Sequence, residues 1–345
     1  MSASGYGSSG MQGYSSDTCH AYVEGVSTSY GYVPSLAAAS TFVALFGASM
    51  LGHAAQMVWF RTWWCSVFSI GCLVELLGWA ARIWSAKCPY AQTPYLMQIT
   101  TLIIAPTFFT AGIYVLLARF IRIFGPQSSI LSPKLYLWIF CTCDIVSLVV
   151  QAAGGGMASS GAGGGGSSGS STNSSTSTST LSTRATSSSS SQSTGTHIMV
   201  GGIIFQLVSI TVFVALGADF AWRVFRRDVS SRRGNAHMPA VIVLFSAMVF
   251  SVLLIYIRSI YRTIELLHGW TSSTMRNEKL LIGLDGAMMV PAVIVFNVFH
   301  PGQLLRKIEL RANSVPMVSD QTLVLQDFEE GGQGDKHGLL AMGQD

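Results

Sequence analysis

Charged and amide side chains occur inside long apolar stretches of this chain, where they could bind a polar group in apolar surroundings. Five of them lie at a similar distance from one end of their stretch: Glu75, Asp144, Gln206, Arg258 and Asp285. At the rise of an α-helix that distance is about 10–14 Å. An ionisable group inside a membrane costs roughly 2.5–3.5 kcal/mol on insertion scales. Each of these groups therefore needs a partner or a functional role.

A second set of polar residues lies closer to the same end of the stretches. Its members are Arg82, Gln98, Gln151, Arg262 and Glu265. Arg258 and Arg262 are one helical turn apart, so they repel each other unless acids face them, whereas Arg262 and Glu265 are close enough to pair. We expect the two sets to form a hydrated or ion-paired cluster that opens toward that side of the membrane.

The charges of the deeper set favour a cationic ligand. If Arg258 pairs with one of the three acids, two acids remain, of which burial could protonate one and the other could attract an amine. An amphiphilic cation would then place its amino head at the acids and its apolar tail among the helices. The alternative is that these residues only pair with one another and hold the helices together.

Composition places these residues in an integral membrane protein. Half of the 345 residues are hydrophobic and 10% are charged, whereas soluble proteins carry about 25% charged residues. A spanning helix needs about 20 mostly apolar residues, and its backbone polar groups must be satisfied within the segment. We therefore predict an all-α fold of seven transmembrane helices. Their approximate bounds are Pro34–Gln56, Thr62–Trp84, Tyr95–Arg119, Ser132–Ala153, Ile198–Trp222, Met238–Glu265 and Glu278–His300.

Basic residues predict which side of the membrane each end occupies. Arg119, Arg122, Arg226 and Arg306 are among the Lys and Arg residues that gather in alternate connections. This favours an N-terminus outside and a C-terminus in the cytoplasm by the positive-inside rule. Residues 1–33 contain no Lys, no Arg and no apolar core, so we expect no cleavable signal peptide.

The same pattern divides the chain into regions. Residues 1–33 are expected to form a mobile extracellular segment, and residues 34–300 the membrane domain. Within that domain, residues 154–197 are rich in Ser, Thr and Gly and should form a disordered extracellular loop, because they offer too few apolar side chains for a core. Residues 301–345 are expected to be a cytoplasmic tail.

Three further features concern covalent structure and backbone. Cys19 and Cys88 fall on the outer, oxidising side, where they could form a disulfide or remain free thiols. Asn173 begins an Asn-Ser-Ser glycosylation sequon on that side, and the alternative is an unmodified spacer. Pro106 and Pro291 lie inside predicted helices, where each removes a helical hydrogen bond and makes either a static kink or a hinge.

The sequence lacks the motifs that are typical of several kinds of activity. No Gly-x-x-x-x-Gly-Lys-Ser/Thr segment is present, so ATP is not expected to drive this chain directly. We find no metal-ligand cluster, no catalytic constellation and no cofactor motif, and nothing indicates a nucleic-acid partner or an oligomeric state. We therefore expect a non-enzymatic protein whose partners are membrane lipids or other amphiphiles. A transporter and a seven-helix receptor both fit this pattern.

The segment Glu75-Leu76-Leu77-Gly78-Trp79-Ala80-Ala81-Arg82 resembles the Glu-x-x-Gly-aromatic-x-x-Arg signature of the fungal RTA-like, lipid-translocating exporter family. Further stretches resemble that family, in its order, across residues 30–305. They are Ala105-Pro106 with Ala111 and Tyr114, Asp144 with Gln151-Ala152-Ala153-Gly154-Gly155-Gly156, Gly202 with Gln206, Arg258-Ser259-Ile260-Tyr261-Arg262 with Glu265, and Asp285 with His300-Pro301. The chain departs from the family in the long tract after Gly156, and at Ile282, where an aromatic residue is expected.

The resemblance implies a seven-helix fungal membrane protein that exports or translocates sphingoid long-chain bases and confers tolerance to toxic amphiphiles. It also implies a plasma-membrane location, with the vacuole or another endomembrane as the alternative. The residues at family motif positions are Glu75, Arg82, Asp144, Gln151, Arg258, Arg262, Glu265 and Asp285. The alternative function is a seven-helix lipid receptor or sensor, which would signal without moving lipid.

Overall fold

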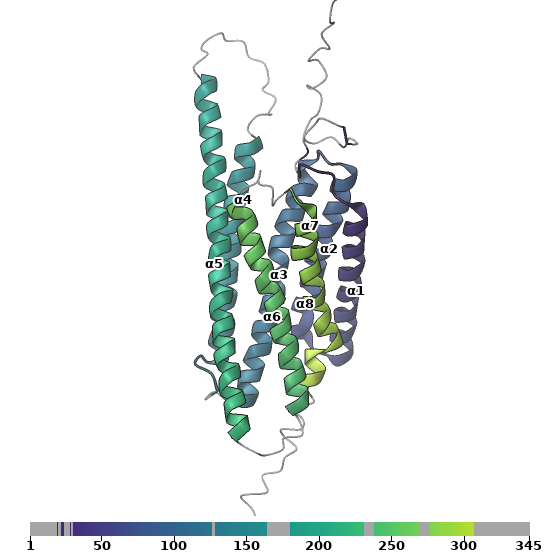
Figure 1. The fold of residues 1–345 in the computed structure, drawn as a ribbon, viewed down its shortest axis with the longest axis vertical. Coiled ribbons are helices and arrows are strands. Elements are labelled where there is room, and N and C mark those ends of the chain that lie inside the picture. The colour runs from purple at the N-terminus through teal and green to yellow at the C-terminus, as the bar shows by residue number, and fades with distance from the viewer. Residues whose placement is uncertain are drawn as a thin grey trace, which may run out of the picture.

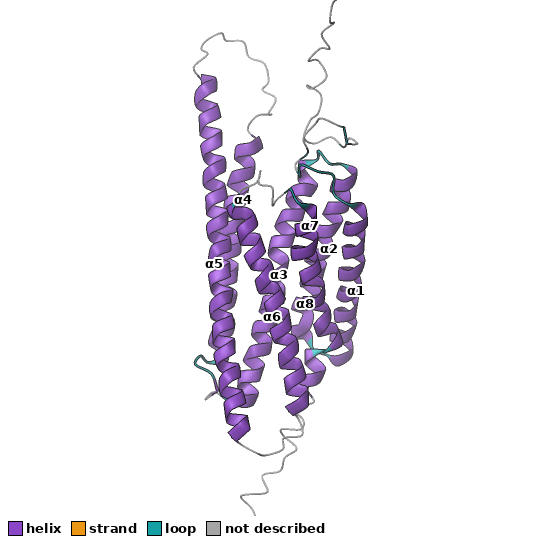
Figure 2. Ribbon diagram, viewed as in Figure 1, coloured by secondary structure: helices purple, strands orange, loops and turns teal. Residues whose placement is uncertain are grey.

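The chain folds into an elongated bundle of helices, seen in a computed structural model (Figure 1). The structure describes residues 19, 22, 23, 28, 30–125, 128–163, 180–230, 238–268 and 276–306. Over these ranges the long elements are all helical and only short turns and loops join them (Figure 2). The all-α class predicted from composition is confirmed.

Seven helical segments of the described chain are long and apolar enough to cross a membrane. The last span combines a short helix, a π-helical turn and a longer helix. The elements are α1 (Leu36–Phe60), α2 (Ser66–Lys87), α3 (Gln92–Phe124), α4 (Pro133–Gly163), α5 (Thr180–Ser230), α6 (Met238–Leu267), α7 (Glu278–Leu280), the π-helical turn Leu281–Gly286 and α8 (Ala287–Val298). The seven predicted spans are therefore confirmed.

Local sequence explains where several helices begin and end. The Ser35 side chain accepts a hydrogen bond from the Ala38 backbone N–H and caps the start of α1. The helix ends at Arg61, whose φ of 54° is left-handed. The chain then turns through the short 3₁₀ segment Trp63–Cys65 into α2. Pro133 opens α4 at the first helical position, where a missing N–H costs little.

Each long helix packs mainly against its neighbours in the chain, and α8 returns to α1, so the bundle closes on itself. Helix α3 lies at the centre of the bundle. Of the most apolar 18 residues of α3, 61% are buried, against 28% for the corresponding stretch of α1. Aromatic pairs fill the core, such as Phe42 on α1 stacked on Trp79 of α2, with ring centroids 4.2 Å apart. Because Trp79 lies one turn after Glu75, this packing fixes the face of α2 that carries the acid.

The prediction of a disordered loop over residues 154–197 is wrong at both edges. Helix α4 continues to Gly163 and α5 already begins at Thr180. Glycines allow this, because a Cβ on Gly154 would lie 2.7 Å from the carbonyl oxygen of Gly195 and would clash with the backbone nitrogen of Met199. The two backbones therefore pack directly on one another, as small residues permit in membranes. The sequon at Asn173 lies outside the described residues and stays a prediction.

The expectation of a mobile segment over residues 1–33 fails for its last part. Tyr30 is buried, and its hydroxyl donates to Gln98 Oε1 at 2.7 Å and is hydrogen-bonded to Ser85 Oγ at 2.9 Å. Cys19 is joined to Cys88 by a disulfide, with Cα atoms 4.7 Å apart. We call the end of the bundle that carries this bond the disulfide end.

Candidate functional site

Two arginines of α6 form a buried ionic cluster with acids of α6 and the last span. Arg258 Nε lies 2.5 Å from Asp285 Oδ1, and Arg262 Nη2 lies 3.3 Å from Asp285 Oδ2. Arg262 Nη1 also lies 2.7 Å from Glu265 Oε2, which is the pair expected from their spacing. Tyr261 donates a hydrogen bond to the other Glu265 oxygen at 2.9 Å. These four charged residues are between 1% and 6% exposed, so their attraction acts with little screening.

A proline on α3 supplies one further partner for this cluster. Arg258 Nη2 donates a hydrogen bond to the backbone carbonyl of Leu102. That carbonyl would normally accept from the N–H of residue 106, but Pro106 has none. The sequence thus frees a backbone acceptor inside the bundle, and Arg258 uses it. This contact ties α6 to the centre of α3.

Glu75 of α2 faces the same cluster and supplies a third acid. The charges of Arg258 and Arg262 attract its carboxylate, and the charge of Asp285 repels it. Its side chain is 1% exposed, and its Oε1 has no hydrogen-bond partner among the described residues. Three acids therefore face two arginines. With Asp285 and Glu265 already paired, Glu75 is the acid in excess.

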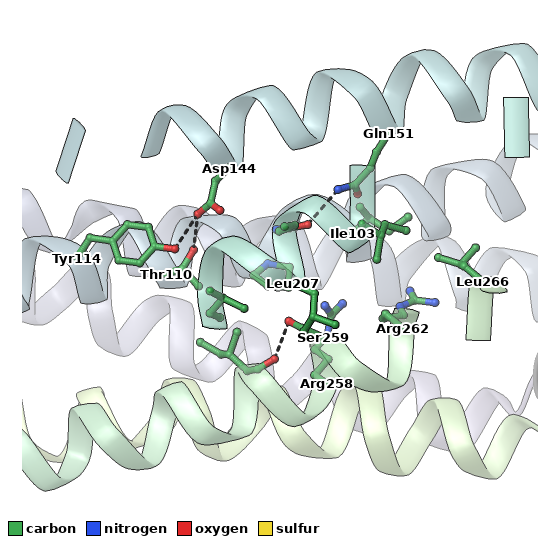
Figure 3. Close-up of a pocket in the computed structure, with 15 residues that line it drawn as sticks. Ile103, Thr110, Tyr114, Asp144, Gln151, Leu207, Arg258, Ser259, Arg262 and Leu266 are labelled. Carbon is green, nitrogen blue, oxygen red and sulfur yellow. Dashed lines mark hydrogen bonds between the residues drawn. The ribbon is translucent and has the colours of Figure 1, made fainter. Parts of the chain in front are cut away.

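A polar cavity lies on the other side of the two arginines, between α3, α4, α5 and α6 (Figure 3). Asp144 of α4 lies on its wall, and its Oδ2 accepts hydrogen bonds from Tyr114 at 3.0 Å and Thr110 at 3.2 Å. Its Oδ1 accepts none from the part of the chain that the structure describes. Asp144 also forms no ion pair there, although Arg258 and Arg262 line the same cavity.

Two amides continue the polar wall of this cavity. Gln151 Nε2 donates to Gln206 Oε1 at 3.0 Å, and Gln206 Nε2 donates to Thr107 Oγ1 at 3.4 Å. The buried Gln151 Oε1 has no partner among the described residues. Asp144 Oδ1 and Gln151 Oε1 are therefore two acceptors without donors, on side chains two helical turns or about 10 Å apart along α4. A ligand that carries hydrogen-bond donors fits this wall.

Arg82 and Gln98 lie in a further site at the disulfide end, whose wall shares Arg262 and Glu265 with the ionic cluster. Arg82 Nη2 is 2.8 Å from Glu278 Oε1 and 3.0 Å from the Tyr32 hydroxyl. The guanidinium also lies over the Tyr30 ring, 5.5 Å from its centroid. Burial raises the pKa of Tyr30 to about 12 and also raises the pKa of Tyr32. Both tyrosine hydroxyls therefore remain neutral over the physiological range.

The predicted polar layer thus divides into three groups. The ionic cluster holds Glu75, Arg258, Arg262, Glu265 and Asp285; the polar cavity adds Asp144, Gln151 and Gln206; the site at the disulfide end holds Arg82 and Gln98. Pro106 lines the polar cavity and Pro291 lies within α8. Within the described residues, no three His, Cys, Asp or Glu side chains gather as metal ligands would.

Sequence reasoning missed three residues of the site at the disulfide end: Glu278, Tyr30 and Tyr32. The sequence indicates Glu278 only as the start of the last span, and the two tyrosines fall in the segment that is expected to be mobile. A signal for Glu278 was available, because it follows Asn277, whose side chain caps the new helix. An acid in the first turn of a span can reach an arginine at the same level of a neighbouring helix.

Comparison with known proteins agrees with the motifs and with this geometry. The RTA1 like protein family matches residues 68–176 and 175–308. A relative from Saccharomyces cerevisiae strain Lalvin EC1118, named "Sphingoid long-chain base transporter RSB1", is 29% identical over 83% of this chain and 76% of its own length.

Two further yeast relatives match a smaller part of the chain. "Protein RTA1" is 28% identical over 68% of this chain and 64% of its own length. "Protein RTM1" is 26% identical over 66% of this chain and 63% of its own length. No solved structure matches. The family resemblance found in the sequence is confirmed, and the chain belongs to the RTA1-like protein family.

Proposed function

We propose that this protein moves sphingoid long-chain bases, or cationic amphiphiles of similar chemistry, across the membrane that it spans. The observation that carries the proposal is Asp144, a buried carboxylate that faces a cavity and has no ion-pair partner among the described residues. Such a group attracts an amine. A relative that is similar over most of this chain is named a sphingoid long-chain base transporter, which supports the same ligand class.

The wall of the cavity matches the head of a long-chain base, which carries an amine beside hydroxyl groups. The ammonium would donate to Asp144 Oδ1, which accepts no hydrogen bond in the described chain. Gln151 Oε1 also lacks a donor there, but it lies two helical turns along α4 from Asp144, so a hydroxyl beside the amine would reach it only once the helices around the cavity shift. Arg258 and Arg262 line the cavity, but Asp285 and Glu265 already compensate their charges. They therefore repel a cationic head only weakly.

The small volume of the polar cavity indicates that the structure shows the protein in a closed state. It measures about 30 Å³, which is enough for about two water molecules and too little for a lipid head group. Loading therefore requires the helices around the cavity to separate. Such an alternation between closed and open arrangements is what a transporter needs.

Glu75 is the group that we assign to proton exchange, since it is the acid in excess beside Arg258. A carboxyl that gains and loses a proton changes the charge balance of the ionic cluster and with it the packing of α6. We place the protein in the plasma membrane with its disulfide end outside, and we assign no enzymatic chemistry to it. Asn173 would be glycosylated on the outer side.

The test is movement of a labelled sphingoid base across liposomes that contain only the purified full-length protein. We expect movement above that of protein-free liposomes, and a loss of about tenfold to a hundredfold in Asp144→Asn, because a charge-assisted hydrogen bond contributes about 1.5–3 kcal/mol. Asp219→Asn is the matched control. It makes the same change in an exposed pair with Arg223 at 2.7 Å, and should move lipid like the wild type.

Two results would contradict the proposal. Equal movement by wild type and Asp144→Asn would remove the polar cavity from the mechanism. Saturable binding of the base by the wild type without any movement would assign the protein to the alternative class, a lipid receptor or sensor.

A further inference from the structure

An apolar cavity lies next to the polar one, on the side away from the disulfide end. Its volume is about 110 Å³, and its walls come from α3, α5 and α6. The lining includes Leu117 of α3, Phe213 of α5 and Val252 of α6. Gly217 of α5 also lines this cavity. Almost no polar surface lines it, so it is suited to hydrocarbon.

The two cavities are one helical turn apart on all three helices. On each helix, one residue lines the polar cavity and a residue three positions away lines the apolar one. These pairs are Tyr114 and Leu117 on α3, Ile210 and Phe213 on α5, and Ile255 and Val252 on α6. Residues three apart lie on the same face of a helix. The apolar cavity therefore continues the polar one along the same faces.

An aromatic contact joins a residue of the polar cavity to a residue of the apolar one. Tyr114 donates its hydrogen bond to Asp144 in the polar cavity. Its ring meets the ring of Phe213 edge to face, with centroids 4.6 Å apart, and Phe213 lines the apolar cavity. A ligand that displaces Tyr114 from Asp144 would therefore also move a ring that packs against the wall of the apolar cavity.

The apolar space extends further along α5 and α6. A third cavity of about 20 Å³ shares Ala221 and Phe245 with the second and reaches Phe225. From Ile210 to Phe225 the distance along α5 is about 20 Å. Val249 and Leu253 on the wall are 39% and 49% exposed, so the space also opens sideways toward lipid. Helix α5 packs much more closely against α4 than against α6, which explains why the gap lies on this side.

We infer that the seam between α5 and α6, from Ile210 to Phe225, holds the alkyl chain of the ligand while the head group lies at Asp144. The inference rests on the proposed function. It adds where the alkyl chain of the ligand lies and the side from which the ligand enters from the bilayer. The seam selects ligands by tail length, because each methylene buried there adds to the binding free energy.

Two glycines of α5 provide a matched pair of variants. A Cβ on Gly217 or on Gly201 would meet nothing within 4 Å, and leucine has a higher helix propensity than glycine. Gly217→Leu should therefore fold and fill the apolar cavity. Gly201→Leu makes the same change on an exposed face that lines neither cavity. Thermal unfolding of both purified variants should match or exceed that of the wild type.

The experiment compares a labelled long-chain base with an analogue that has the same head group and less than half the tail length, in liposomes with each variant. Relative to wild type, Gly217→Leu should move the long-chain base about tenfold more slowly, because exclusion of about two buried methylenes costs about 1.4 kcal/mol. It should move the short analogue at the wild-type rate. Gly201→Leu should move both like the wild type.

Each other outcome overturns the inference in a different way. Wild-type movement of both ligands by Gly217→Leu would show that the seam holds no tail. An equal loss of both would show that the substitution acts on something other than the tail. If the wild type itself moves neither ligand, the proposed function fails, and the inference falls with it.

Discussion

Pro106 and Arg258 are linked through one backbone oxygen, although they lie on different helices. Pro106 cannot donate to the carbonyl of Leu102, and the Arg258 guanidinium donates to it instead. The proline therefore places a hydrogen-bond acceptor at the depth of the ionic cluster. This arrangement favours a fixed kink in α3 over a hinge, because a buried side chain holds the freed carbonyl.

Pro106→Ala tests this link. The new N–H would bond to the Leu102 carbonyl and compete with Arg258, so we expect slower lipid movement with a free energy of unfolding within about 1 kcal/mol of the wild type. The measurements are liposome movement and denaturant unfolding in detergent. Pro291→Ala is the control, since no described side chain bonds to the Ala287 carbonyl four residues before it. Equal effects of the two substitutions on lipid movement would contradict the link.

Asp285→Asn should destabilise the fold strongly. It leaves two buried arginines without their shared acid, and breaking a buried ion pair costs about 3–5 kcal/mol. The same substitution at Asp219 breaks a half-exposed pair with Arg223 and should cost less than about 1 kcal/mol. Denaturant unfolding of the two purified variants gives the comparison. A loss of similar size in both would mean that the ionic cluster does not hold the helices together.

Glu75→Gln should change how lipid movement responds to a proton gradient and have only a small effect on the free energy of unfolding. Because Glu75 is the acid in excess and its Oε1 is unpaired among the described residues, removal of its charge should destabilise the protein far less than Asp285→Asn does. We expect the variant to lose the response of lipid movement to an imposed proton gradient. The measurement is movement into liposomes with and without that gradient. A gradient response as large as that of the wild type would exclude Glu75 as the proton-exchanging group.

Cys19→Ser should lower the free energy of unfolding, because loss of the disulfide raises the conformational entropy of the unfolded chain. The disulfide joins residues 69 positions apart, and closure of a loop of that length contributes about 4 kcal/mol in the chain-entropy description. Cys88→Ser should have the same effect, and the double variant should add nothing. Thermal unfolding with and without a reductant measures this, with Cys143→Ser, at a free cysteine, as the control. A reductant that shifts wild type and Cys19→Ser equally would contradict the explanation.

Hydropathy and charge predicted the spans and one local ion pair. Each span is a long apolar run that must satisfy its own backbone, so its approximate bounds follow from the chain alone. The Arg262–Glu265 pair follows from spacing on one helix. Both features depend only on neighbours along the sequence.

The division of the polar layer could not be predicted in the same way. Depth along a helix follows from residue number, but the side to which Asp144 or Glu75 points depends on how each helix is rotated in the bundle. Packing sets that rotation: Trp79 stacks on Phe42 and turns Glu75 toward Arg258. The Arg82–Glu278 pair joins residues far apart in the chain, and their spacing in sequence carries no information about it.

The π-helical turn Leu281–Gly286 makes two distant ion pairs depend on the number of residues between them. Glu278 precedes this turn and pairs with Arg82, whereas Asp285 lies inside it and pairs with Arg258. Conversion of this turn to the ordinary α-helical repeat, with the same number of residues, would rotate the two acids relative to each other, because each residue of an α-helix turns the chain by about 100° and each residue of a π-helix by less. Only one pair could then keep its partner. The widened turn thus acts as a spacer that adjusts the angle between the two acids, and the length of this segment is constrained even where its side chains are not.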